Sequence, residues 1–188
     1  MRFLLCLFII IQTVSLSAKD YYPDHSSIQY AGNIGFISVG GGYDFFNEKL
    51  GLELFYGYAP KSVAGLDIHS MTFKVNYSPW HININEKIEL RPFNIGIGLT
   101  YNFGDNYFIN QSSHYPDNYY KSNAIYFTPY LGLSILYKNS LKLRAIEFYT
   151  ELGTVDKYLR DYLNSAFEEY YVDLEDIINI SFGFRVYF

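Results

Sequence analysis

The stretch INISFGFRVYF, at residues 178–188, alternates large apolar residues with polar or small ones at every step. Its even positions are all large and apolar, whereas its odd positions carry Asn, Ser, Gly, Arg and Tyr. Successive side chains of a β-strand point to opposite faces of the sheet, so this pattern predicts a strand with one apolar and one polar face. The apolar face suits lipid, and the polar face suits the interior of a barrel.

The same alternation recurs upstream in stretches that each have one face of large apolar residues. These stretches are 37–45, 50–59, 69–78, 93–103, 125–135 and 146–152. An eighth, shorter strand is expected at residues 26–30, because bacterial membrane barrels have an even number of strands. The sequence therefore predicts an all-β fold, an eight-stranded antiparallel up-and-down transmembrane β-barrel.

A soluble sandwich or lipocalin-like barrel would also alternate, but its polar face would meet water and carry many Lys and Glu residues. Here that face consists mainly of Gly, Ser, Thr, Asn and Tyr, which is typical of a barrel interior. Gly96 and Gly183 are among the glycines on it. We expect these glycines to leave room for large interior side chains such as Tyr130 and Tyr149.

The connections between the predicted strands alternate in length. Tight connections are expected at 47–48, 85–87 and 139–140, and longer ones at 61–65, 104–121 and 154–172. Bacterial outer-membrane barrels combine short periplasmic turns with longer extracellular loops, and this order fits if the last strand ends in the periplasm. Apolar residues at helical spacing from 156 to 170 predict a short amphipathic helix lying over the extracellular mouth.

Composition narrows the function classes. The chain has 188 residues, of which 20% are aromatic, and a net charge of −5. The aromatic content excludes intrinsic disorder. The absence of a basic block argues against nucleic acid as a partner. No run of about 18 apolar residues occurs, so a helical membrane protein is excluded too.

The N-terminus predicts export. Arg2 precedes an apolar run at 3–11, and small residues follow at 15–18. This is the pattern of a secretory signal peptide, expected to cover residues 1–18 with cleavage after Ser17 or Ala18. The barrel domain would then be 19–188 and would lack cysteine, because Cys6 lies inside the signal. The expected location is the outer membrane.

The C-terminal pattern of Phe184, Val186 and Phe188 resembles the signal that the barrel-assembly machinery reads, with Val186 where Tyr is commoner. The chain resembles the small eight-stranded outer-membrane barrels of Gram-negative bacteria, in the broad class of the OmpA transmembrane domain. Its segments PDHSSIQYAGNIGF, YGYAP, NYSPW, YPDNYY and ELGTVDKYL are similar to those of an uncharacterised outer-membrane barrel family. The resemblance implies a fold and a location, with outer-membrane lipids, lipopolysaccharide and the assembly machinery as partners, but no activity. We expect a monomer.

Five charged residues fall on the predicted interior face: Glu53, Lys74, Glu147, Glu151 and Arg185. They could form an ion path, a catalytic pair or a structural network. We favour the network, because an eight-stranded interior is narrow and buried charges must be paired. A contact between Glu151 and Arg185 is one arrangement that such a network allows, although strand order does not require it.

His69 is the residue that most suggests an enzyme. Some barrels of the kind that this chain resembles deacylate lipid A with a Ser-His pair on the lipid-facing wall. Antiparallel register places His69 beside Tyr58 and Phe103 with no outward serine or acid, and Ser70 points to the other face. Without a nucleophile in reach, His69 is expected to be an interfacial residue. We expect no catalytic residue, metal or cofactor.

The long connection at 104–121 offers the contact candidates His114, Tyr115, Asp117, Tyr119 and Tyr120. Its composition suits either turn formation or a surface that binds a glycan or a protein. The expected function is structural or adhesive, with a packed polar interior and extracellular binding loops. The alternatives are an enzyme that modifies lipid A or phospholipid, and a narrow channel.

Overall fold

The computed structural model describes residues 22–104, 106–108, 124–138, 143–165 and 177–188. The strands are β1 (His25–Ala31), β2 (Ile37–Phe45), β3 (Leu50–Ala59), β4 (Ile68–Tyr77), β5 (Ile82–Asn83), β6 (Ile88–Phe103), β7 (Ile125–Lys138), β8 (Ala145–Gly153) and β9 (Asn179–Tyr187). The helices are α2 (Lys61–Ala64) and α3 (Asp156–Ser165). The expected signal peptide and the loop candidates lie outside the described residues; these candidates are His114, Tyr115, Asp117, Tyr119 and Tyr120.

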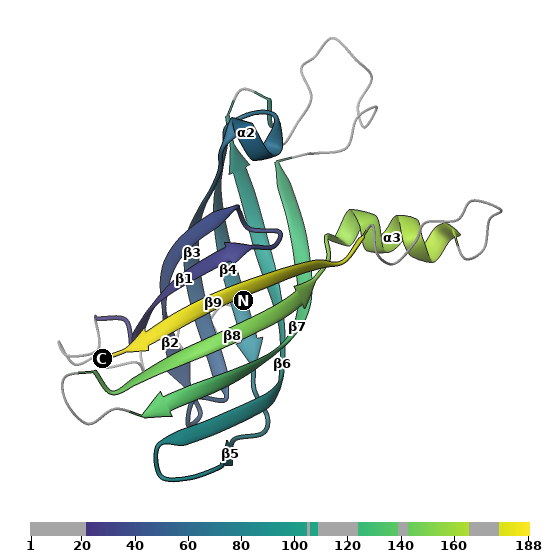
Figure 1. Ribbon diagram of the computed structural model, residues 1–188. Helices are drawn as coiled ribbons and strands as arrows, with labels where there is room; N and C mark the ends of the chain where they lie inside the picture. Colours follow the sequence, from purple (N-terminus) through teal and green to yellow (C-terminus); the bar gives the residue numbers. More distant parts are fainter. Residues whose placement is uncertain (1–21, 105, 109–123, 139–142, 166–176) are drawn as a thin grey trace, which may run out of the picture.

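Eight of the strands form a closed antiparallel barrel (Figure 1). Their order around the barrel is β1, β2, β3, β4, β6, β7, β8 and β9, and each pairs with the next in antiparallel fashion. The pairing of β9 with β1 closes the circle. The predicted eight-stranded antiparallel barrel is confirmed. Because each of these strands has a neighbour on both sides, the barrel has no open sheet edge through its middle, whereas residues 125–129 of β7 extend past β8 and pair only with β6.

The first strand, β1, is longer than the sequence suggests. The prediction covers 26–30, and the structure adds His25 and Ala31. Ile28 lies opposite Val39 on one side and opposite Phe184 on the other, so β1 is fully integrated into the wall. The added residue His25 is buried in the interior.

The two faces of the wall are those that the alternation predicts. In β9, Phe182 and Phe184 point outward and are about half exposed, whereas Ser181 and Arg185 are buried inside. The same alternation of exposed and buried residues runs along the other barrel strands. The barrel is therefore apolar outside and polar inside.

The strand β6 departs from the prediction. It begins at Ile88 and not at residue 93, and its register with β7 shifts between Arg91 and Asn94. A β-bulge of this kind moves the alternation by one residue, so the odd positions before it and the even positions after it face inward. Asn85 closes the turn from β5 into β6 by accepting hydrogen bonds from the backbone N–H groups of residues 87 and 88. The connection from β4 to β6 is thus longer than the tight turn expected at 85–87, because it contains β5.

The helices lie at one end of the barrel or beside it. The short helix α2 occupies the connection between β3 and β4, where a longer loop is expected. A helix also forms at α3, but Figure 1 shows it extending sideways from the end of β8 and not over the mouth. The carboxylate of Asp156 accepts a hydrogen bond from the backbone N–H of Phe127 (3.1 Å), which attaches the start of α3 to β7. Neither helix in the described residues is long and apolar enough to cross a lipid bilayer.

Candidate functional site

The barrel interior is a network of buried charged residues. All five residues that the sequence places there are buried, namely Glu53, Lys74, Glu147, Glu151 and Arg185. They come from β3, β4, β8 and β9, so the network connects opposite sides of the barrel. An isolated buried charge is costly, and the observed partners show how these charges are compensated.

The centre of the network is a two-point contact between Arg185 and Glu53. The Nε and Nη2 atoms of Arg185 each donate to one carboxylate oxygen of Glu53 at 2.9 Å. Glu53 also accepts hydrogen bonds from the Ser27 hydroxyl at 2.9 Å and from the Asn76 amide at 3.0 Å. The ring of His25 lies 3.2 Å from the same carboxylate. Every oxygen of this buried carboxylate is thus paired, as its burial requires.

A second pair joins β4 to β8. Lys74 Nζ donates to both carboxylate oxygens of Glu151, at 2.7 and 2.8 Å, and to the side-chain oxygen of Gln29 at 3.2 Å. The same ammonium lies 4.4 Å from the centre of the Tyr130 ring, within the range of a cation–π contact. The lysine therefore has an anionic, an amide and an aromatic partner.

The contact between Glu151 and Arg185 that the sequence allows is replaced by other pairings. Glu151 binds Lys74, whereas Arg185 contacts Glu53 and also lies 3.3 Å from Glu147. Which residues meet across the lumen depends on the order and register of the strands, and not on the inward-facing pattern alone.

Sequence reasoning missed several members of the network. Arg91 lies 3.7 Å from Glu147 and donates to Glu89 at 3.0 Å, and both Arg91 and Glu89 are buried. They precede the bulge in β6, where the alternation predicted from 93–103 does not extend. His25 was missed because it lies one residue before the predicted first strand. In 88–91 the inward-facing positions are odd, whereas in 93–103 they are even. Treating the two stretches separately could have revealed Glu89 and Arg91 as interior residues.

At the end of the barrel near β5, Glu89 is the shared partner of several basic groups. Its carboxylate lies 2.9 Å from Lys138 Nζ and 3.2 Å from the ring of His81. Burial, together with the nearby positive charge of Arg91, lowers the pKa of His81, which lies between β4 and β5. This shift favours the neutral form of the His81 imidazole, whereas Lys138 and Arg91 are cationic partners of Glu89.

The predicted role of interior glycines is confirmed. A Cβ atom added to Gly96 would lie 2.2 Å from the Tyr130 ring, and one added to Gly183 would lie 2.2 Å from the Tyr149 ring. These positions are occupied by aromatic rings from neighbouring strands. The middle of the interior is consequently filled: the cavities beside the Lys74–Glu151 and Arg185–Glu53 pairs have volumes of only about 20 and 10 Å³, whereas a cavity of about 400 Å³ lies at the end near Glu89. Each of the two small cavities holds about one water molecule.

The turn between β1 and β2 folds into one end of the barrel. We call residues 32–36 the inward turn. Its Ile34 is buried, and the Ile34 carbonyl accepts a hydrogen bond from the Ser70 hydroxyl of β4 at 2.6 Å. The Tyr126 hydroxyl of β7 donates to the Asn33 carbonyl at 2.8 Å. The inward turn thus reaches from β1 and β2 across the interior to β4 and β7, and it covers the charged network.

Gly57 of β3 makes this placement possible. A Cβ atom there would lie 1.9 Å from the Ile34 carbonyl oxygen, which is backbone and cannot move independently. We expect Gly57→Ala to lower the free energy of unfolding by about 1–3 kcal/mol through overpacking. Gly153→Ala is the matched control, because its nearest neighbour would be a side-chain atom at 3.3 Å. Urea unfolding in detergent measures both, and an equal loss in the two variants would contradict the position of the inward turn.

On the outer wall, His69 lies opposite Tyr58 and Phe103, as the register predicts. Its Nδ1 is 2.6 Å from the Tyr56 hydroxyl, and its ring lies 5.0 Å from that of Tyr58. An acidic residue, Asp67, lies nearer to His69 than the sequence predicts. Its carboxylate accepts a hydrogen bond from the Tyr58 hydroxyl at 2.8 Å, and this bond lowers the pKa of Asp67. Among the contacts that the structure describes for His69, none involves a serine.

The predicted assembly residues occupy the end of the barrel opposite α2. The Phe184 ring packs outside against Phe148 at 5.0 Å, and Val186 lies between Ser26 and Ile146 in the wall. The backbone N–H of Phe188 donates to the Asp24 carbonyl at 3.1 Å. The last residue is thereby held beside the start of β1, where the barrel closes.

Within the described part of the chain, no three His, Cys, Asp or Glu side chains are grouped so that they could hold a metal ion. Comparison of the whole chain with known proteins finds no matching family model, curated protein or solved structure. The function is therefore inferred from the geometry of the barrel itself.

Proposed function

We propose that this protein spans the bacterial outer membrane as a barrel with a packed interior, and that its role is structural or adhesive and not enzymatic. The observation that carries the proposal is the inverted distribution of polarity. Among the described residues, twenty polar or charged side chains are buried against nine hydrophobic ones. A protein that folds in water has the opposite arrangement.

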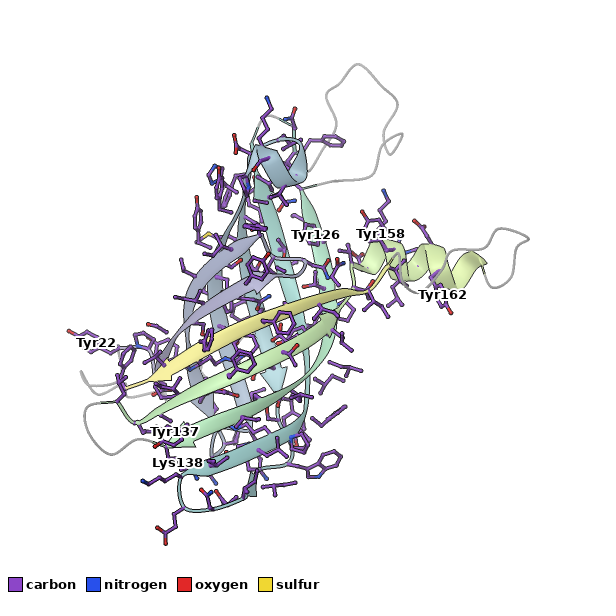
Figure 2. The ribbon with its side chains drawn as sticks, in the orientation of Figure 1. Tyr22, Tyr126, Tyr137, Lys138, Tyr158 and Tyr162 are labelled. Carbon is purple, nitrogen blue, oxygen red and sulfur yellow. The ribbon has the colours of Figure 1, made fainter. Side chains whose placement is uncertain are left out.

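The outer surface supports a lipid environment. Large apolar residues with about half of their surface exposed cover the middle of the wall, among them Leu54, Ile97, Leu133 and Phe182. Water-soluble monomers do not expose contiguous apolar belts of this extent. Figure 2 places Tyr137 near the end of the barrel opposite α2, and the outward-facing Tyr101 lies near the other end, where β6 ends. Tyrosine near the two membrane interfaces is typical of transmembrane barrels.

The filled interior argues against a channel. The Arg185–Glu53 and Lys74–Glu151 pairs cross the lumen, and the cavities beside them hold about one water molecule each. Conduction would require the pairs to separate and the rings of Tyr130 and Tyr149 to move. The same contacts support our proposal that the five interior charges have a structural role.

The enzyme alternative has little support from the outer wall. His69 contacts Tyr56 and Tyr58, and a hydrolase of the Ser-His type needs a serine within hydrogen-bond reach of the histidine. We propose that His69 and its tyrosine neighbours lie at the membrane interface. The proposed partners are outer-membrane lipids, lipopolysaccharide and the assembly machinery, and the proposed state is a monomer.

Removal of Phe188 tests the membrane location. If this exposed terminal residue is part of an assembly signal, its deletion should remove most of the protein from the outer-membrane fraction. In the full-length chain, the unheated protein should migrate differently from the heated one in gels, because a closed ladder of hydrogen bonds resists detergent. Phe46→Ala, which removes another exposed phenylalanine in the β2–β3 turn, is the control. Recovery of the unaltered protein as a soluble periplasmic species would reject the proposal.

A further inference from the structure

A cavity of about 350 Å³ lies near the α2 end of the barrel. Its floor is the inward turn, and its walls come from α2 and from the ends of β3, β4, β6, β7 and β9. We call it the mouth pocket. Its polar lining includes Asn33, Ser70, Asn102, Tyr126 and Asn179.

The mouth pocket is separate from the charged network. The inward turn lies between them, and Lys74 and Glu151 line the small cavity of about 20 Å³ beneath it and not the mouth pocket. The two cavities share the residues Gly32, Asn33, Ile34 and Asn179. Among the described residues that line the mouth pocket, none is charged. A ligand with a net charge would lose its hydration there without gaining a counter-charge, which is unfavourable.

The lining offers two kinds of surface to a ligand. Asparagine amides, a phenol and a hydroxyl provide hydrogen-bond donors and acceptors, whereas Ile34, Phe36, Val63 and Ile68 provide an apolar side. A sugar ring presents the matching surfaces, with hydroxyl groups at its edge and C–H groups on its faces. We propose that the mouth pocket binds a neutral saccharide.

Two asparagines are already oriented for such a ligand. The Asn179 amide nitrogen donates to the Asn33 side-chain oxygen at 2.8 Å, and the Asn33 backbone is fixed by Tyr126. Among the described residues, this leaves the amide nitrogen of Asn33 as a donor and the side-chain oxygen of Asn179 as an acceptor. A sugar hydroxyl can satisfy both, because it donates and accepts. The volume is near the lower end of the 300–1,000 Å³ typical of ligand sites, roughly the space for a mono- or disaccharide.

The strands around the mouth pocket do not all extend equally far, and β8 and β9 are shorter there than β6 and β7. β9 begins at Asn179, opposite Gly153 at the end of β8, whereas β7 continues past Tyr130 to Ile125 with β6 as its partner. The saccharide could therefore be free in solution or be the sugar of a glycolipid beside the wall. Binding of a glycolipid rests on the proposed membrane location of the protein, whereas binding of a free saccharide does not.

Nuclear magnetic resonance of the mature chain in detergent tests the ligand class. Glucose, N-acetylglucosamine and lactose should shift the side-chain amide signals of Asn33 and Asn179, and glucuronate and glucosamine should bind at least about tenfold more weakly. Asn179→Leu should weaken the binding of the neutral sugars about tenfold. Asn83→Leu, the same change in β5 at the other end, should leave it unaltered. Absence of any shift up to the solubility limit, or equal binding of the charged analogues, would overturn the proposal.

The same titration in lipid nanodiscs separates the two sources. If lipopolysaccharide alone shifts the Asn33 and Asn179 signals and free sugar competes with it, the ligand is a membrane glycolipid. If only free sugar shifts them, the ligand is a soluble glycan. Membrane fractionation is a separate measurement, so failure of the saccharide proposal and failure of the proposed location are distinguishable.

Discussion

Lys74→Met should lower the free energy of unfolding by about 3–5 kcal/mol, because it leaves the buried Glu151 carboxylate without its cation. Methionine keeps most of the side-chain volume of lysine. The loss of stability therefore reflects the unpaired Glu151 carboxylate and not a cavity. Reversible urea unfolding in detergent, followed by the mobility difference between folded and unfolded barrel, gives the value.

The double variant tests whether this loss belongs to the pair. Lys74→Met combined with Glu151→Gln should be more stable than Lys74→Met alone, because no uncompensated charge remains. The exposed Asp156–Arg160 pair on α3, at 3.6 Å, serves as the control cycle and should show a coupling of only about 0.2–1 kcal/mol. Additive losses for Lys74 and Glu151 would show that the buried contact does not stabilise the barrel.

Leu54→Arg should be the most damaging change on the outer wall. Leu54 lies in the middle of β3 between Gly41 and Phe73, with its side chain outward and half exposed. If that surface meets hydrocarbon, an arginine there costs about 2–4 kcal/mol in lipid. Folding in vesicles, measured by urea titration, provides the comparison with the unaltered chain.

Ser62→Arg is the control for the wall. Ser62 is exposed in α2, beyond the end of β3, and a new arginine there should change stability by about 0.5 kcal/mol or less. Equal tolerance of arginine at the two positions would mean that the outer face of β3 is in contact with water.

Alternation predicted seven of the eight barrel strands, and the even strand number of membrane barrels supplied the eighth. In β9 and β3, each outward or inward assignment depends only on odd or even position, and the burial of Arg185 and Glu53 agrees with it. The prediction failed where the period changes. The bulge between Arg91 and Asn94 reverses the phase of β6. Pro92 lies within this stretch, and a proline inside a strand is typical of a bulge, but the alternation by itself does not show the reversal. Sequence reading therefore started the strand too late and omitted two interior charges.

The partners inside the lumen depend on information that the alternation does not contain. Lys74 and Glu151 lie 77 positions apart, and their contact follows from strand order, register and tilt together. The inward turn is similar: Ile34 reaches Ser70 only because Gly57 has no side chain. A local pattern predicts which way a residue points, but not which residue it meets across the barrel.

Contact between the wall and lipid chains is the central claim, and nuclear Overhauser effects in lipid nanodiscs measure it directly. We expect effects from acyl-chain protons to residues of the outward belt, namely Leu54, Val75, Ile97, Leu133 and Phe182. Inward residues such as Ser134 and Thr100 should show none. Water contacts along the outward belt in place of lipid contacts, or a barrel that stays monodisperse without detergent, would contradict the account.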